Sequence, residues 1–112
     1  MPLLSRLFRG VAALEACLVR DDKHVTPGSQ GEHVRLIQRA LVLLGDKTIP
    51  TSEYVAGLYG PRTAAAVLAY KTKRSIINSS YQRQPDNIVG KMTIAALDRD
   101  VVANQDSPAV QA

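Results

Sequence analysis

Two short segments of this chain carry the same pattern of residues, and each is typical of the start of a helix. The pattern runs apolar-Gly-x-x-Thr-x-x-Ala-apolar. Its glycine allows a tight loop before the helix, and its threonine lies in the first turn, where the hydroxyl can cap backbone donors. Two matching entries predict two helices that reach one core in related ways. The segments are Tyr59-Gly60-Pro61-Arg62-Thr63 with Ala66-Val67, and Val89-Gly90-Lys91-Met92-Thr93 with Ala96-Leu97.

Another helix is predicted before these two. Ser29 and Glu32 form a capping box, in which each side chain bonds a free backbone N–H of the other residue. Gly45 supplies the left-handed residue that commonly ends a helix, and residues 46–57, which show no sustained period, are predicted to form a loop. Pro61 then suits the first turn of the next helix, because its missing N–H costs nothing there. The apolar residues of the earlier helix fall on one stripe: Val34, Ile37, Leu41 and Leu44.

The first 25 residues are predicted to form an amphipathic helix that packs on the rest of the chain. Glu15 interrupts the apolar stretch and no small-residue cleavage site follows, so a signal peptide is not predicted. Residues 103–112 are small and polar, which is typical of a flexible tail. The apolar residues that recur at helical spacing in the first segment are Leu4, Leu7, Phe8, Val11, Leu14 and Leu18.

The composition favours a core of small aliphatic side chains between closely packed helices. The chain is 46% apolar, yet it has only four Tyr, one Phe and no Trp. No apolar run approaches the ~20 residues that a membrane span needs, so no span is predicted. The net charge of +4 is short of a dense basic stripe, and nucleic-acid binding is not expected.

The residues that most often carry catalysis are few. His24 and His33 lie in no metal-ligand spacing, and the single cysteine, Cys17, excludes an internal disulfide and a cysteine-based zinc site. Cys17 falls on the apolar side of its predicted helix, which favours a small buried hydrophobe over a catalytic dyad with His24. The acidic residues are scattered. We therefore expect a chain that is not an enzyme and that carries no cofactor and no metal.

Three ordered motifs over residues 26–98 resemble the peptidoglycan-binding domain family of the three-helix type. The chain departs from the family pattern at Ala56 (usually Asp), Lys71 (usually Gln) and Asn87 (usually Gly). The first motif is Gly28-Ser29-Gln30-Gly31-Glu32-His33-Val34 with Ile37-Gln38 and Leu41. The second is Ala56-Gly57-Leu58-Tyr59-Gly60-Pro61-Arg62-Thr63 with Ala66-Val67 and Tyr70-Lys71, and the third is Asp86-Asn87-Ile88-Val89-Gly90-Lys91-Met92-Thr93 with Leu97.

This resemblance implies an all-α fold, with a compact three-helix bundle over residues 26–102 and the amphipathic helix of residues 1–25 added to it. It implies a bacterial, non-catalytic module that binds peptidoglycan and anchors or targets an associated effector or lytic protein. Such a module is expected to act at the periplasm or cell envelope and, without a classical signal peptide, to be cytoplasmic before a secretion machine delivers it. The alternative is a protein-interaction or carrier module of a secretion or phage-tail machine that kept the fold and lost glycan binding.

The expected binding residues lie in a stretch that contains no acidic residue. Between Tyr54 and Pro85 every charged side chain is basic. The stem peptides of peptidoglycan carry free carboxylates, which a cationic groove beside tyrosine hydroxyls would suit. For single residues such as Lys73, a solvated helix end is an equally good interpretation, because cations favour the C-terminal end of a helix. The candidate ligand-binding residues are Arg62, Tyr70, Lys71, Lys73, Arg74, Tyr81 and Arg83.

Overall fold

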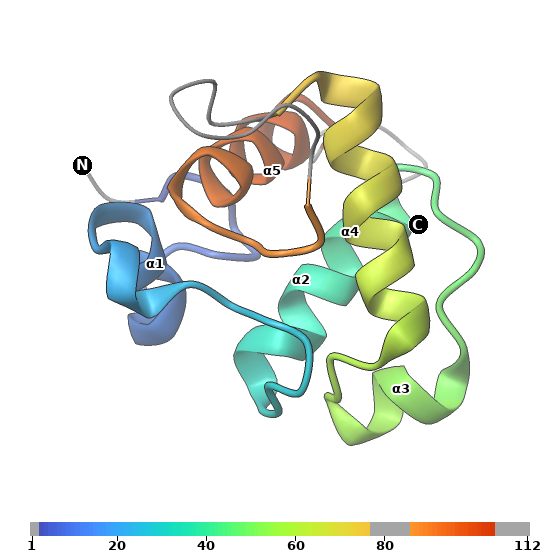
Figure 1. Ribbon diagram of the computed structural model, residues 1–112. Coiled ribbons are helices and arrows are strands. Elements are labelled where there is room, and N and C mark those ends of the chain that lie inside the picture. Colours follow the sequence, from blue (N-terminus) through green and yellow to red (C-terminus); the bar gives the residue numbers. More distant parts are fainter. Residues whose placement is uncertain (1–2, 77–85, 105–112) are drawn as a thin grey trace.

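The computed structural model describes residues 3–76 and 86–104, and this part of the chain is a mostly helical, compact globule (Figure 1). It contains five α-helices and one 3₁₀ turn, and no β-strand occurs within those ranges. The helices are α1 (Ala12–Val19), α2 (Glu32–Leu43), α3 (Thr51–Ala56), α4 (Pro61–Arg74) and α5 (Lys91–Asn104), with the 3₁₀ turn η1 at Asp21–Lys23.

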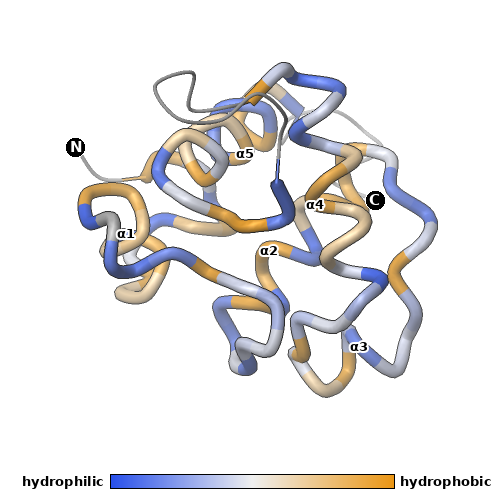
Figure 2. Tube along the Cα trace, viewed as in Figure 1, coloured by the Kyte–Doolittle hydropathy of each residue, from blue (hydrophilic) through white to orange (hydrophobic). Residues whose placement is uncertain are grey.

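Helix α2 is the centre of the arrangement. It packs against α3, α4 and α5, while α1 lies against α5. Apolar stretches recur along the helices (Figure 2), and their buried side chains join in one core. Burial of such apolar surface is the main driving force for this packing, at roughly 25 cal/mol per Å². The most deeply buried apolar side chains include Phe8, Leu14, Val34, Ile37, Tyr59, Val67, Ile94 and Leu97.

The two segments with a common pattern do begin α4 and α5 in the same way. The carbonyl oxygen of Gly60 accepts the N–H of Ala64, and the carbonyl oxygen of Gly90 accepts the N–H of Ile94 at the equivalent place. The residue before each glycine is buried, as is each threonine. An isolated antiparallel bridge lies at or just before each entry, pairing Leu58 with Gln30 and Val89 with Val25.

The expected capping box at the start of α2 is wrong. Gly31, at φ +146°, is the residue before the helix and provides no side-chain cap. Ser29 Oγ instead accepts the backbone N–H of Thr26, and Glu32 forms an exposed ion pair with Arg35 at 3.0 Å. Backbone hydrogen bonds to the segment before α4 explain the difference. The backbone of Gly28 and Ser29 pairs with that of Tyr59, and this pairing holds Ser29 away from the position that a capping box requires.

The prediction of a loop over residues 46–57 is wrong in its second half, where α3 forms. Six residues are too short for a helical period to be visible in the sequence. The helix starts after Pro50 and ends at Gly57, which has the left-handed conformation typical of this position.

The first turn of α4 is capped by a carboxylate from α3 and not by the hydroxyl of Thr63, as the pattern predicts. Glu53, 7% exposed, accepts the N–H groups of Arg62 and Thr63 at 3.1 and 2.8 Å. The Thr63 hydroxyl donates to the same carboxylate at 2.7 Å and accepts from the Gln38 amide at 2.9 Å. Burial by itself would raise the pKa of Glu53, but these hydrogen bonds outweigh it and hold the pKa below its ordinary value.

The N-terminal segment is not one amphipathic helix over residues 1–25. Helix α1 is confined to Ala12–Val19, and Gly10, at φ +77°, separates it from a turn-rich segment before it. Two carboxylates hold that segment by its backbone. Asp98 of α5 accepts the N–H groups of residues 4 and 5 at 3.0 and 2.8 Å, and Glu15 of α1 accepts those of residues 3 and 10, both at 2.9 Å. These bonds replace the helical hydrogen bonds that the apolar spacing alone would predict.

Candidate functional site

A pocket of about 480 Å³ opens where the C-terminal ends of three helices meet. Its lining combines four aliphatic side chains, Leu41, Leu44, Ala66 and Ala69, with polar and charged ones. Helix α2 ends there, the last turns of α4 and α5 flank it, and all three belong to the central packing of the fold (Figure 1). The lining residues are Leu41, Leu44, Gly45, Asp46, Ala66, Ala69, Tyr70, Lys73, Arg74, Asp100 and Asn104.

Both signs of charge are present in this lining. Arg74 forms an ion pair with Asp100 at 2.9 Å, and the Tyr70 hydroxyl donates to the other oxygen of the same carboxylate at 2.6 Å. Burial, followed by the hydrogen bond to Asp100, raises the pKa of Tyr70, so its hydroxyl stays protonated and acts as a donor at neutral pH. Asp46 Oδ1 accepts the backbone N–H and the hydroxyl of Thr48 at 2.7 and 2.8 Å.

The helix ends add a further negative contribution. The aligned peptide dipoles of an α-helix give its C-terminal end about half a negative charge. Three such ends line the pocket, next to Asp46 and Asp100. The two basic side chains, Lys73 and Arg74, therefore lie in a mixed field and not in the purely cationic groove that the sequence predicts.

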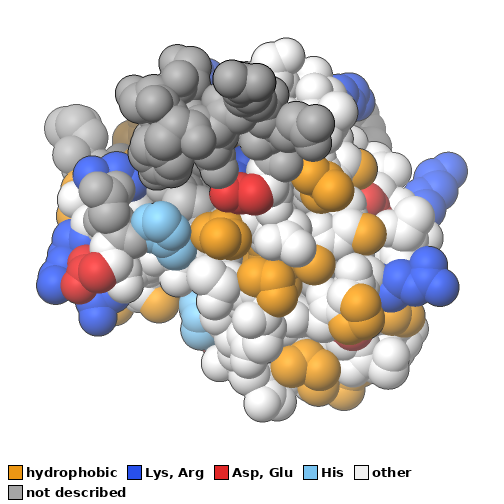
Figure 3. Space-filling model, viewed as in Figure 1, with side chains coloured by type: hydrophobic (Ala, Val, Ile, Leu, Met, Phe, Trp, Pro, Cys, Tyr) orange, Lys and Arg blue, Asp and Glu red, His pale blue; other side chains and the backbone are white. Residues whose placement is uncertain are grey.

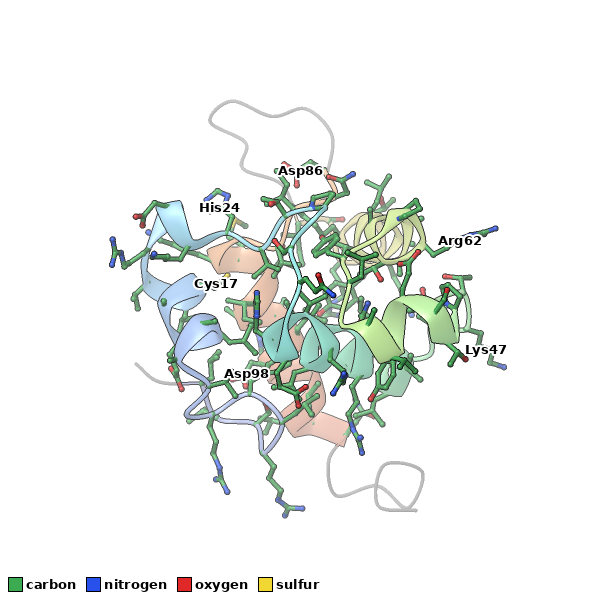
Figure 4. All side chains as sticks on the ribbon, turned by 90° about the horizontal axis from the view of Figure 1, so that it is seen from below. Cys17, His24, Lys47, Arg62, Asp86 and Asp98 are labelled. Carbon is green, nitrogen blue, oxygen red and sulfur yellow. The ribbon has the colours of Figure 1, made fainter. Side chains whose placement is uncertain are left out.

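The structure brings together only part of the predicted binding set. Tyr70, Lys73 and Arg74 line the pocket. Arg62 lies in the first turn of α4, at the opposite end of that helix, and its side chain extends from the surface (Figure 4). Tyr81 and Arg83 fall outside the described residues.

Lys71 lies away from the pocket and is buried. Its Nζ forms an ion pair with Asp86 and donates to the carbonyl oxygen of Ile88 at 2.8 Å. Its side chain is 7% exposed, whereas that of Asp86 is 37% exposed. Lys71 thus attaches the chain before α5 to the end of α4, which is a structural contact.

Three of the pocket's polar side chains are not predicted from the sequence: Asp46, Asp100 and Asn104. Asp46 follows α2 and the other two lie on α5, so all three are far along the chain from the basic residues of α4. The absence of acidic residues between Tyr54 and Pro85 does not predict the charge of the pocket, because acidic side chains from other segments line it as well. The sequence gives only the local position of each acid: Asp46 follows the end of α2, and Asp100 lies on α5.

A second, smaller pocket of about 360 Å³ is mainly apolar and lies between α2, the chain after it, and α3. Helices α2, α3 and α4, with the chain between α3 and α4, also expose large apolar side chains. Figure 3 shows hydrophobic side chains at the surface on the side of α3 and α4. The pocket is lined by Arg39, Val42, Leu43, Ile49, Thr51 and Tyr54, and the exposed apolar side chains on these elements are Val42, Val55, Leu58 and Leu68.

Cys17 is buried, as predicted, and its thiol donates to the carbonyl oxygen of Val89 at 3.4 Å. Burial raises its pKa to about 11, so the reactive thiolate is scarce at neutral pH. His24 is exposed. Over the described ranges no three His, Cys, Asp or Glu side chains are grouped to hold a metal ion, and no helix there is both long and apolar enough to cross a membrane.

The pocket at the ends of α2, α4 and α5 is therefore the site best equipped to bind a small charged group. Comparisons of this chain with protein-family models, with curated proteins and with solved structures find no match.

Proposed function

We propose that this chain is a non-catalytic peptidoglycan-binding module of the three-helix type, which anchors or targets an associated effector or lytic protein at the bacterial cell wall. The observation that carries the proposal is the pocket at the three helix ends, where Tyr70, Lys73 and Arg74 lie together. These residues belong to or directly follow the second motif of the resemblance. The carboxylates of a stem peptide suit the basic side chains, which can donate charge-assisted hydrogen bonds.

Contacts between the three motifs support the three-helix type. The N–H of Gly31, in the first motif, donates to the carbonyl oxygen of Gly57, in the second, at 3.0 Å. Gln38 donates to the carbonyl oxygen of Leu58 and to Thr63, both at 2.9 Å. The chain just before the first motif pairs with the third through the bridge between residues 25 and 89. Residues of the first and second motifs are therefore in direct contact, and the third motif pairs with the chain just before the first.

The binding set proposed from the structure is smaller than the one proposed from the sequence. Lys71 is not part of the proposed binding set, because its ammonium group forms an ion pair with Asp86 and donates to the carbonyl oxygen of Ile88. Arg62 is left out because it lies at the far end of α4 from the pocket.

Retention on insoluble peptidoglycan sacculi tests the proposal. The protein is expected to co-sediment with sacculi at physiological salt, and Lys73→Gln is expected to weaken retention by about tenfold, because a charge-assisted hydrogen bond contributes roughly 1.5–3 kcal/mol. Arg62→Gln is the matched control, since it removes the same charge from the same helix outside the pocket. Retention no greater than that of an unrelated protein of equal net charge would overturn the proposal.

The apolar surface of α2, α3 and α4 favours a second candidate, a protein-interaction or carrier module of a secretion or phage-tail machine. Exposed large apolar side chains, together with a small apolar pocket on two of the same helices, are typical of a protein contact. Val55, 63% exposed, is the best place to test it. If this candidate is correct, one dominant protein co-purifies, Val55→Asp removes it, and sacculi retain nothing.

A further inference from the structure

The charges of the pocket at the ends of α2, α4 and α5 are balanced, not cationic. Lys73 and Arg74 on α4 line it together with Asp46, which follows α2, and Asp100 on α5. Arg74 and Asp100 neutralise one another at 2.9 Å. Lys73 and Asp46 are different, because neither forms an ion pair with another described residue. Within residues 3–76 and 86–104, one positive and one negative side chain of the pocket thus have no ionic partner.

The place of each charge says what kind of group it can bind. Lys73 is exposed on the last turn of α4 and can donate to a carboxylate. Asp46 has one oxygen engaged by Thr48, which leaves acceptor sites on the carboxylate for an ammonium group. The end of α2 next to it strengthens that preference, since a helix C-terminus stabilises cations. Asp100, with two of its acceptor sites used by Tyr70 and Arg74, adds to the negative part of the lining.

Part of the pocket lining is aliphatic. Leu41, Leu44, Ala66 and Ala69 line it beside the charged side chains and can contact methylene groups. The pocket therefore matches a ligand with three parts: a carboxylate, an ammonium group and a short apolar stem. A plain carboxylate would leave Asp46 facing an anion, and a plain amine would leave Lys73 facing a cation.

We propose that this pocket binds the zwitterionic end of a diamino acid in the stem peptide, where one terminal carbon carries both an ammonium and a carboxylate group. Diaminopimelate presents that end on a short methylene chain, whereas lysine in the same position of other walls presents the ammonium alone. This inference rests on the proposed function and deepens it by naming the group that is recognised. The carboxylate contacts Lys73, the ammonium contacts Asp46, and the methylenes lie against the aliphatic side chains of the lining.

Titration calorimetry with two synthetic tripeptides tests the inference directly. The probes are L-alanyl-γ-D-glutamyl-meso-diaminopimelate and the same peptide with L-lysine in the third place. We expect the lysine peptide to bind about tenfold more weakly, because it lacks the carboxylate for Lys73. A third peptide has an amide in place of the side-chain carboxylate of diaminopimelate, the one next to the free ammonium group. We expect it to bind as weakly as the lysine peptide. Equal affinities for all three peptides, or no binding of any, would overturn the inference.

Variants separate recognition from folding. Lys73→Gln should weaken the diaminopimelate peptide about tenfold, leave the lysine peptide unchanged and so abolish the discrimination. Asp46→Asn keeps the oxygen that accepts from Thr48 and should weaken both peptides, because both carry the ammonium. Lys23→Gln, which removes an exposed charge beside α1, is the matched control and should change neither. A Lys73→Gln variant that keeps full discrimination contradicts the inference.

Sacculi distinguish this inference from the proposed function. Equal retention on walls that contain diaminopimelate and on walls that contain lysine supports wall binding and refutes the zwitterion-binding pocket. Discrimination between the peptides without retention on any sacculus supports the pocket and refutes wall anchoring.

Discussion

The carboxylate of Glu53 is expected to be one of the main single contributors to the stability of this fold. It lies on α3, is almost completely buried, and accepts two backbone N–H groups and one hydroxyl at the start of α4. Removing a helix cap costs about 0.5–2 kcal/mol. The buried N–H of Thr63, left without a partner, adds roughly 1–3 kcal/mol. Glu53→Ala is therefore expected to lower the free energy of unfolding by about 3 kcal/mol, a large part of the 5–15 kcal/mol typical of small domains.

A glutamine at this place tests the role of the charge. Glu53→Gln keeps one oxygen for the Thr63 donors, but its amide group faces the N–H of Arg62 and it carries no negative charge near the start of α4. We expect a loss of about 1–2 kcal/mol, measured as a shift of the urea midpoint without a change in slope. Glu32→Gln is the control, because that carboxylate is exposed and its ion pair with Arg35 is worth less than about 0.5 kcal/mol.

The pH dependence of this contribution has a definite sign. The pKa of Glu53 is lower in the folded chain than its ordinary value of 4.5. The stabilisation is therefore complete above that ordinary pKa and is lost as the pH falls through the lower pKa of the folded state. The unfolding free energy of Glu53→Gln should decline less steeply than that of the wild type below pH 4.5. A glutamine variant as stable as the wild type, with the same acid slope, would refute the capping role.

Three further substitutions test other contacts. Asp98→Ala removes the acceptor of two backbone N–H groups of the N-terminal segment and should cost about 2 kcal/mol, with faster amide exchange measured at residues 4 and 5. Lys71→Met should cost about 1–3 kcal/mol in urea unfolding by breaking the pair with Asp86, and should leave retention on sacculi unchanged. Gly57→Ala should cost more than about 1 kcal/mol in thermal unfolding, because the residue has φ +61° and its Cβ would lie 2.7 Å from the carbonyl oxygen of Gly31; no loss would contradict that close approach.

Features that depend on neighbours along the chain could be predicted from the sequence. The apolar period placed α2, and α4 begins at Pro61 as expected. Gly45 has the predicted positive φ just after the end of α2. The burial of Cys17 was also correct. Periodicity and capping preferences act over one or two helical turns, so they are visible in the order of residues alone.

Contacts between distant segments could not be predicted in this way. The expected capping box of Ser29 and Glu32 does not form, because the backbone of Ser29 pairs with the loop before α4. The first turn of α4 is capped by Glu53 and not by the hydroxyl of Thr63, and Glu53 lies ten residues earlier and on another helix. Glu15 was interpreted as an interruption of an apolar stretch, yet it holds the backbone of the segment before α1. In each case a carboxylate or a backbone group from elsewhere satisfied donors that local rules assign to a neighbour.

The candidate site shows the same division. The order of residues is enough to predict a basic helix end that carries Tyr70, Lys73 and Arg74. The inward position of Lys71 against Asp86, and the presence of Asp46 and Asp100 in the pocket, depend on how distant segments pack together. The physical reason is that net charge along a segment is a property of the chain, whereas the electrostatic field in a pocket is a sum over every helix that ends there.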